Sequence, residues 1–190
     1  MATIKTADLI AKFQYALDNK WGYILNTWHT NWSRSDQNAK VNYMIRNFGP
    51  DWAKNEAAKK NSNYTAAMYG EQWIGHWVTD CSGLFYWAFK ELGGSMYHGS
   101  NTMWNKYCVS KGDLKNGKRT DGNELKPGTA VFVLKNKTDR SHVGLYIGNG
   151  TVIEASGTKV GVITTKITNS KWCEWGELKG VDYDTSTPAK

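Results

Sequence analysis

The sequence predicts a single α+β domain, with helices in its first half and an antiparallel run of strands in its second. Apolar residues recur at helical spacing up to about residue 100. From about residue 110 the pattern changes to short β-rich runs separated by turns. Helices followed by strands are typical of α+β folds. The chain of 190 residues fits one domain, which we expect over residues 1–184, with a linker stub or disordered tail at 185–190.

Helical spacing of apolar residues is clearest at the start of the chain and after Asp80. Leu9, Phe13 and Ala16 mark one face of a helix over 6–19, and residues 21–25 interrupt the pattern as a loop or short extended piece. We interpret residues 28–75 as a helical insert. Further helices are expected near 36–47, 51–60, 64–73 and 81–92, with a short one after Ser100.

Turn residues divide the second half into strands. The Gly148-Asn149-Gly150 segment is the strongest hairpin signal in the chain. We expect strands at 129–134, 142–147, 151–155, 160–167 and 178–181.

Composition and charge limit the classes of partner. The formal net charge is +7, which favours association with polyanions, among which nucleic acid, anionic membranes and the anionic polymers of a bacterial wall all qualify. The sequence shows no arginine cluster or zinc-finger spacing that would favour nucleic acid. Residues 1–23 lack the pattern of a secretory signal, and we find no run long enough to insert in a membrane. We therefore expect a monomer that is made in the cytoplasm and reaches any wall substrate by another route.

Three cysteines, Cys81, Cys108 and Cys173, are too few for a disulfide scaffold. Cys108 and Cys173 either pair or remain buried thiols. Cys81 differs because it opens the helix at 81–92, where unpaired N–H groups and the helix dipole favour a thiolate and a developing oxyanion. Gly83 would allow a substrate backbone to approach closely. A small buried residue is the alternative interpretation of Cys81, unless a partner base exists.

His142 provides that base, and Glu154 follows it across the predicted hairpin. A two-residue turn would pair Leu145 with Glu154 and put His142 on the opposite face. A three-residue loop with a left-handed Gly150 would pair Gly144 with Glu154. The side chains of His142 and Glu154 would then lie on one face of the sheet. We expect the three-residue loop, with Glu154 accepting the Nδ1–H of His142 and Nε2 facing Cys81.

The remaining histidines, His29, His76 and His98, lie in less informative contexts. We expect them to be surface or core residues.

These residues resemble the NlpC/P60 family of cell-wall cysteine peptidases. The resemblance rests on Asp80-Cys81-Ser82-Gly83 opening a helix, on Leu125 to Phe132 before a strand, and on the hairpin from His142 to Glu154. It implies a papain-like fold in which the cysteine helix packs on an antiparallel sheet. It also implies catalysis by Cys81, His142 and Glu154, and substrate-side roles for Tyr23, Asp80, Ser82 and Gly83. No metal or organic cofactor is implied, and the third catalytic position in this family is more often His, Asn or Gln.

The resemblance implies hydrolysis of an amide bond in the peptidoglycan stem peptide. Together with the missing signal pattern it suggests a phage or prophage lysin, released through a holin or carried on a phage particle. Two alternatives remain. The same residues could act on a protein, as in a toxin-like deamidase or acyltransferase, or the chain could be a wall-binding module without catalysis.

Overall fold

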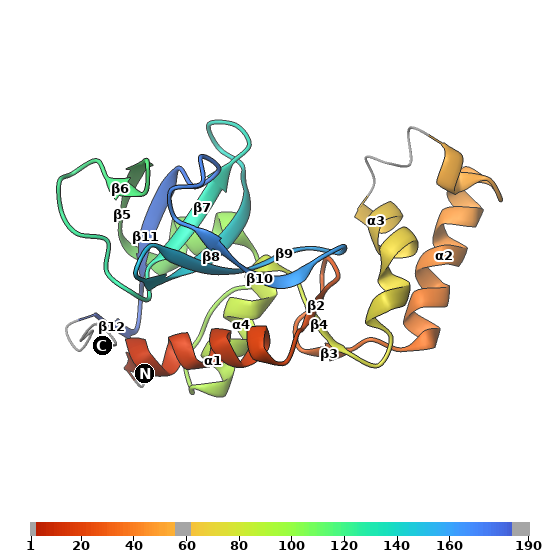
Figure 1. The fold of residues 1–190 in the computed structure, drawn as a ribbon, viewed down its shortest axis with the longest axis horizontal. Coiled ribbons are helices and arrows are strands. Elements are labelled where there is room, and N and C mark those ends of the chain that lie inside the picture. Colours follow the sequence, from red (N-terminus) through yellow and green to blue (C-terminus); the bar gives the residue numbers. More distant parts are fainter. Residues whose placement is uncertain (1–2, 56–61, 184–190) are drawn as a thin grey trace.

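A computed structural model of the chain describes residues 3–55 and 62–183. Its main feature is a seven-stranded sheet in which every neighbouring pair is antiparallel (Figure 1). The strands, in spatial order, are β10 (Gly161–Lys166), β9 (Thr151–Gly157), β8 (Arg140–Gly148), β7 (Ala130–Leu134), β11 (Glu174–Leu178), β5 (Cys108–Lys115) and β6 (Lys118–Arg119).

Two helices, α1 (Thr6–Asp18) and α4 (Cys81–Glu91), pack against this sheet (Figure 1). The core between them is built from the apolar faces that the helical spacing predicts. Its fully buried members include Leu9, Phe13, Leu84, Phe85, Phe132 and Leu145. Burying a side chain of this size contributes about 1.5–3 kcal/mol, so this layer holds α4 firmly on the sheet.

A three-stranded sheet leads the chain into α4. Its strands are β2 (Gly22–Tyr23), β4 (Trp77–Thr79) and β3 (Thr30–Asn31), with β4 in the middle. Tyr23 on β2 pairs with Thr79, which is two residues before Cys81. This sheet therefore places Tyr23 beside the start of α4. A further parallel pair joins β1 (Ile4–Lys5) to β12 (Val181–Asp182).

The insert between β3 and β4 forms a helical lobe, which we define as residues 34–55 and 62–73. Helices α2 (Arg34–Phe48) and α3 (Ser62–Tyr69) pack side by side, and Figure 1 shows them at the opposite end of the molecule from β5 and β6. The lobe has a small core of its own, made of Met44, Trp52, Tyr64 and Ala67. The expected helices at 36–47 and 64–73 are confirmed in position, although α3 ends at Tyr69 and continues as the 3₁₀ turn η3 (Gly70–Trp73).

The expected helix at 51–60 is wrong over its described part. Residues 52–54 form one 3₁₀ turn, η1 (Trp52–Lys54), and Asn55 is extended, whereas 56–60 lie outside the described residues. The expected short helix after Ser100 is confirmed as α5 (Ser100–Thr102), which continues as a π-helical turn (Met103–Tyr107).

The strand predictions fail in the part of the sheet formed by β11 and β5. The expected strand at 178–181 is wrong, because β11 ends at Leu178 and a left-handed Gly180 turns the chain into β12. Strand β5 was missed as a separate element, since its sequence lacks a regular apolar alternation and Leu114 is its one buried residue. The proposed tail at 185–190 lies outside the described residues.

All three cysteines are free, so the possible pairing of Cys108 with Cys173 is excluded. Both of these thiols are half-buried. Among the described residues, every helix is too short or too polar to cross a membrane.

Candidate functional site

The first turn of α4 is built around the Asp80 carboxylate. Its Oδ1 accepts a hydrogen bond from the backbone N–H of Gly83 at 2.7 Å and one from Ser82 Oγ at 3.2 Å. Asp80 is thus the N-cap of the helix, a role typically worth about 1 kcal/mol. Cys81 is the first helical residue, as predicted.

Two more groups bind the same carboxylate from other parts of the chain. The backbone N–H of Asn26 donates to Oδ2 at 2.8 Å, and His98 Nε2 lies 2.9 Å from Oδ1 and 2.8 Å from Oδ2. The contacts of Asp80 therefore join α4 to the loop after β2 and to the loop after α4. His98 is half-buried, and its bond to Asp80 is a contact that the sequence did not predict.

Gly83 meets the protein itself rather than open space. A Cβ at this position would collide with the Thr27 carbonyl oxygen, which also accepts the backbone N–H of Asp80 at 2.9 Å. The loop after β2 thus crosses directly over the first turn of α4. The prediction that Gly83 makes room for a substrate backbone is wrong, because that room is filled by the Thr27 carbonyl.

The Cys81 thiol is buried, with 7% of the residue exposed. Burial and the negative charge of Asp80 raise its pKa to about 12, although backbone N–H groups of Val143, Ser82 and Cys81 itself lower it. The N–H groups at the helix terminus do favour the thiolate, as expected, but burial and the Asp80 carboxylate outweigh them. The bond from Val143 is informative, because that N–H belongs to the residue directly after His142 and places the thiol beside this part of β8.

The hairpin that joins β8 to β9 has a two-residue turn and not the three-residue loop that we predicted. Gly148 pairs with Thr151, and Asn149 and Gly150 both have positive φ (48° and 72°), as a type I′ turn requires. The register then shifts by one residue between Gly148 and Tyr146, which leaves Ile147 as a β-bulge.

The bulge restores the predicted side-chain parity. Beyond it Leu145 pairs with Ile153, so Gly144 comes opposite Glu154, and a Cβ on Gly144 would lie 3.3 Å from the Glu154 Cβ. His142 therefore shares one face of the sheet with Glu154. Trp172 and Val152 fill the space beside Gly144, so a Cβ at this position would collide with both side chains.

Glu154 is fully buried and receives donors from three elements. His142 Nε2 lies 2.6 Å from Oε2, Thr165 Oγ1 on β10 donates to Oε1 at 2.7 Å, and Lys171 Nζ is 2.6 Å from each oxygen. Burial alone would raise the pKa of this carboxyl. The hydrogen bonds from His142, Lys171 and Thr165 outweigh burial and lower the pKa to about 2. The carboxylate is therefore ionised at any physiological pH.

His142 contacts Glu154 through a different ring nitrogen from the one that we predicted. We expected Nδ1 to face Glu154, whereas Nε2 does so. The physical reason is distance, because Nε2 is the ring nitrogen farther from the backbone and can span the gap to the neighbouring strand. Nδ1 is therefore the ring nitrogen that is left for a second partner.

Packing fixes the orientation of the His142 ring. The ring stacks on Trp172, with centroids 5.7 Å apart and planes inclined by 23°. Lys171 Nζ lies 4.5 Å from the centroid of the same indole, within the range of a cation–π contact. Sequence analysis missed both Lys171 and Trp172, because they lie between two strands in a segment without a regular pattern.

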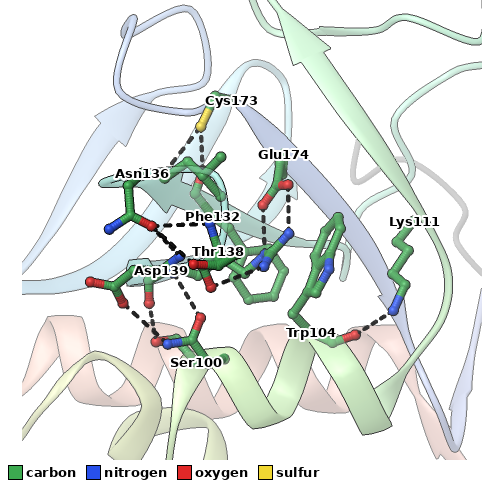
Figure 2. Close-up of polar contacts among 12 residues, drawn as sticks. Ser100, Trp104, Lys111, Phe132, Asn136, Thr138, Asp139, Cys173 and Glu174 are labelled. Atoms are coloured by element: carbon green, nitrogen blue, oxygen red, sulfur yellow. Dashed lines mark hydrogen bonds and ion pairs between the residues drawn. The ribbon is translucent and has the colours of Figure 1, made fainter.

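The beginning of β8 is anchored two residues before His142. The Arg140 guanidinium donates two hydrogen bonds of 2.8 Å to Glu174 on β11 and lies 4.2 Å from the centroid of the Trp104 ring. Its backbone carbonyl accepts the Ser100 hydroxyl. Figure 2 shows these contacts around Ser100, Trp104 and Glu174. Bidentate Arg–carboxylate pairs are directional, so this anchor restricts the position of β8.

Tyr23 is half-buried beside Cys81 and Asp80. Burial raises the pKa of its phenol above the usual range, and the neighbouring Cys81 and Asp80 raise it further. The phenol is therefore a neutral donor next to the thiol.

His29 belongs to a separate aromatic cluster. His29 stacks between Trp21 and Trp77, at centroid distances of 4.9 and 4.0 Å, and burial lowers its pKa. No group of three or more His, Cys, Asp or Glu that could hold a metal ion occurs within the residues that the structure describes.

Comparison with known proteins relates this arrangement to a family. The model of the NlpC/P60 family matches residues 64–177. Murein DD-endopeptidase MepH of Escherichia coli (strain K12) is 29% identical over 102 residues, which cover 49% of this chain and 32% of that protein. A protein of Mycobacterium tuberculosis (strain H37Rv) named as a probable endopeptidase is 34% identical over 77 residues, covering 40% of this chain and 17% of that protein. The chain thus spans a third or less of these relatives.

The solved structures include a crystal structure of the NlpC/p60 domain of the peptidoglycan hydrolase SagA. It superposes with a TM-score of 0.50 at 11% identity, and covers 91% of this chain and 98% of that domain. At this identity the likeness concerns the fold alone. The expected papain-like α+β fold, with the cysteine helix packed on an antiparallel sheet, is confirmed.

Proposed function

Because the chain belongs to the NlpC/P60 family, we propose that it is a peptidoglycan hydrolase that cleaves an amide bond in the stem peptide of the bacterial cell wall. One observation supports the proposal above all. A buried, ionised Glu154 binds His142, and the next residue, Val143, donates its N–H to the Cys81 thiol at a helix N-terminus. Together they supply the nucleophile, the base and the carboxylate that orients the base, which acyl transfer through a thioester requires.

In the proposed reaction His142 Nδ1 takes the proton of Cys81 while the sulfur attacks the carbonyl carbon of the scissile amide. Backbone N–H groups at the start of α4 stabilise the oxyanion. The imidazolium, held by Glu154 through Nε2, gives its proton to the leaving amine and a thioester forms. Water, deprotonated by His142, then attacks the thioester, which releases the carboxylic acid product and restores the thiol.

The residues around the thiol divide into two groups in this proposal. Tyr23 and Ser82 are the substrate-side residues, because they lie next to Cys81. Asp80 and Gly83 have structural roles in this proposal. Asp80 caps α4, and the missing side chain of Gly83 leaves space for the loop after β2.

The net charge of +7 supports a wall substrate, since the wall polymers are anionic. We extend the proposal to a lysin of a phage or prophage. Lysis of whole cells by added protein tests this extension, and failure to lyse any cell type whose purified wall is cleaved would contradict it.

The test of hydrolysis uses purified walls of the lysine and diaminopimelate types. We expect new amino groups to appear, with mass spectrometry of the released fragments identifying the cleaved bond. Cys81→Ala should abolish release without loss of folding, whereas Cys108→Ala, at a second free thiol, should keep it. An active Cys81→Ala protein would end the proposal.

A wall-binding module without catalysis is the second candidate. The burial of Cys81, with only 7% of the residue exposed, favours this candidate, because a substrate carbonyl must reach the sulfur before it can react. Sedimentation with purified walls, without release of amino groups by the wild-type protein, would establish this alternative.

A further inference from the structure

Lys171 makes the closest charged contact of Glu154. Its ammonium lies 2.6 Å from both carboxylate oxygens, and one of these, Oε2, is the atom bound by His142 Nε2. Lys171 comes from the segment between β10 and β11, where its backbone N–H donates to Asn169 Oδ1 at 3.1 Å. The hydrogen bond to Asn169 holds the backbone of Lys171, and the indole of Trp172 contacts its ammonium, so both restrict the position of this side chain.

The shared carboxylate sets up a balance of charge. Glu154 is fully buried and carries one negative charge, and Thr165 contributes a neutral hydroxyl. A buried carboxylate requires one positive partner. Lys171 already supplies that charge, so the imidazole does not have to be protonated to balance it.

The groups on the other side of the imidazole favour the same state. Cys81 and Asp80 lie at the start of α4, and Tyr23 lies on β2. Burial and the nearby Asp80 carboxylate raise the pKa of the Cys81 thiol, which disfavours the thiolate charge that would retain a proton on His142. A neutral imidazole beside an un-ionised thiol is the starting state for general-base catalysis, whereas a thiolate–imidazolium pair would already have transferred the proton.

We propose that Lys171 is a positioning residue that balances the charge of Glu154, keeps His142 neutral in the free protein and so makes it a general base instead of half of an ion pair. The catalytic part of this inference rests on the proposed function. The charge balance does not, because it concerns the free protein and can be measured without a substrate.

The first measurement is the pKa of His142 by NMR titration of the imidazole, whose signals are assigned by their loss in His142→Ala. Removing the ammonium leaves Glu154 to be balanced by the imidazolium, so Lys171→Met should raise the pKa of His142 by about one unit or more. Lys171→Arg should restore the wild-type value. Lys166→Met removes a lysine from the exposed end of β10 and should change nothing.

The second measurement is the pH dependence of the reaction of Cys81 with iodoacetamide. In Lys171→Met the retained imidazolium should stabilise a thiolate and add a reactive plateau at neutral pH that the wild type lacks. On a wall substrate the acid limb of kcat/KM should move to higher pH by the same amount as the pKa. Lys171→Gln gives the same comparison if Lys171→Met does not fold.

The outcomes separate the two proposals. An unchanged pKa of His142 in folded Lys171→Met and Lys171→Gln would overturn the role of Lys171, even if the wild type cleaves walls. A raised pKa with no cleavage of any wall would support the charge balance and contradict the proposed function.

Discussion

His142 and Glu154 lie on neighbouring strands, and the imidazole Nε2 of the first is 2.6 Å from the carboxylate Oε2 of the second. The contact is diagonal across the hairpin, with Gly144 opposite Glu154. Since Glu154 is buried and bound by three donors, it holds the imidazole in one orientation and leaves Nδ1 as the ring nitrogen that can act as the base.

Glu154→Gln should slow wall cleavage without abolishing it. The amide keeps the size of the side chain but loses the charge that stabilises the imidazolium during the reaction. We expect kcat/KM to fall roughly ten- to a thousandfold, less than for Cys81→Ala. Steady-state release of amino groups from walls measures this effect. Unchanged turnover would show that Glu154 is only a structural residue.

The same substitution should change the acid stability. The pKa of Glu154 is about 2 in the folded protein, below the ordinary value of 4.5, so the carboxylate stabilises the fold above pH 4.5. This stabilisation, on the order of 3 kcal/mol, is lost as the pH falls from 4.5 to 2. Urea unfolding at stepped pH should therefore show a smaller acid loss in Glu154→Gln than in the wild type. Parallel curves for the two proteins would contradict the assignment.

Gly83→Ala should destabilise the start of α4. Its Cβ would collide with the Thr27 carbonyl, which is held in place by the backbone N–H of Asp80. We expect a loss of about 1–3 kcal/mol in the free energy of unfolding, measured by urea denaturation. Gly157→Ala is the matched control, because a Cβ there has open space, and a similar cost at both positions would rule out the steric explanation.

Arg140→Lys should weaken the anchor of β8. The lysine keeps the charge but loses the bidentate bonds to Glu174 and the stacking on Trp104. We expect a cost of about 1.5–3 kcal/mol together with a lower kcat, since His142 is two residues away. Arg34→Lys is the control, because its pair with Glu71 is exposed and should contribute less than about 1 kcal/mol. Equal effects of the two variants would exclude a special role for the buried pair.

Local patterns in the sequence were enough to predict the helix that carries Cys81 and the hairpin that carries His142 and Glu154. Helical spacing and turn residues act over a few positions, and they placed α1, α2, α4 and β7 to β10 close to their observed positions. The turn itself was wrong, because a bulge such as that at Ile147 depends on packing and leaves little trace in the residue pattern.

The partners of the site residues were beyond such patterns. His98 reaches Asp80 across 18 positions of the chain, and Lys171 reaches Glu154 across 17. Both come from segments without periodicity, so only the folded chain brings them to the carboxylates. The protonation state of Cys81 was misjudged for a related reason. The helix terminus is visible in the sequence, whereas burial and the orientation of Asp80 are not.

The bulge at Ile147 decides which face of the sheet carries the imidazole. If Ile147 paired regularly with Val152, Leu145 would come opposite Glu154 and the imidazole would project from the reverse side of the sheet. A chain without Ile147 would instead keep every pair from Tyr146–Val152 onward, so related sequences that are one residue shorter between Tyr146 and Thr151 should have a regular hairpin and the same catalytic face.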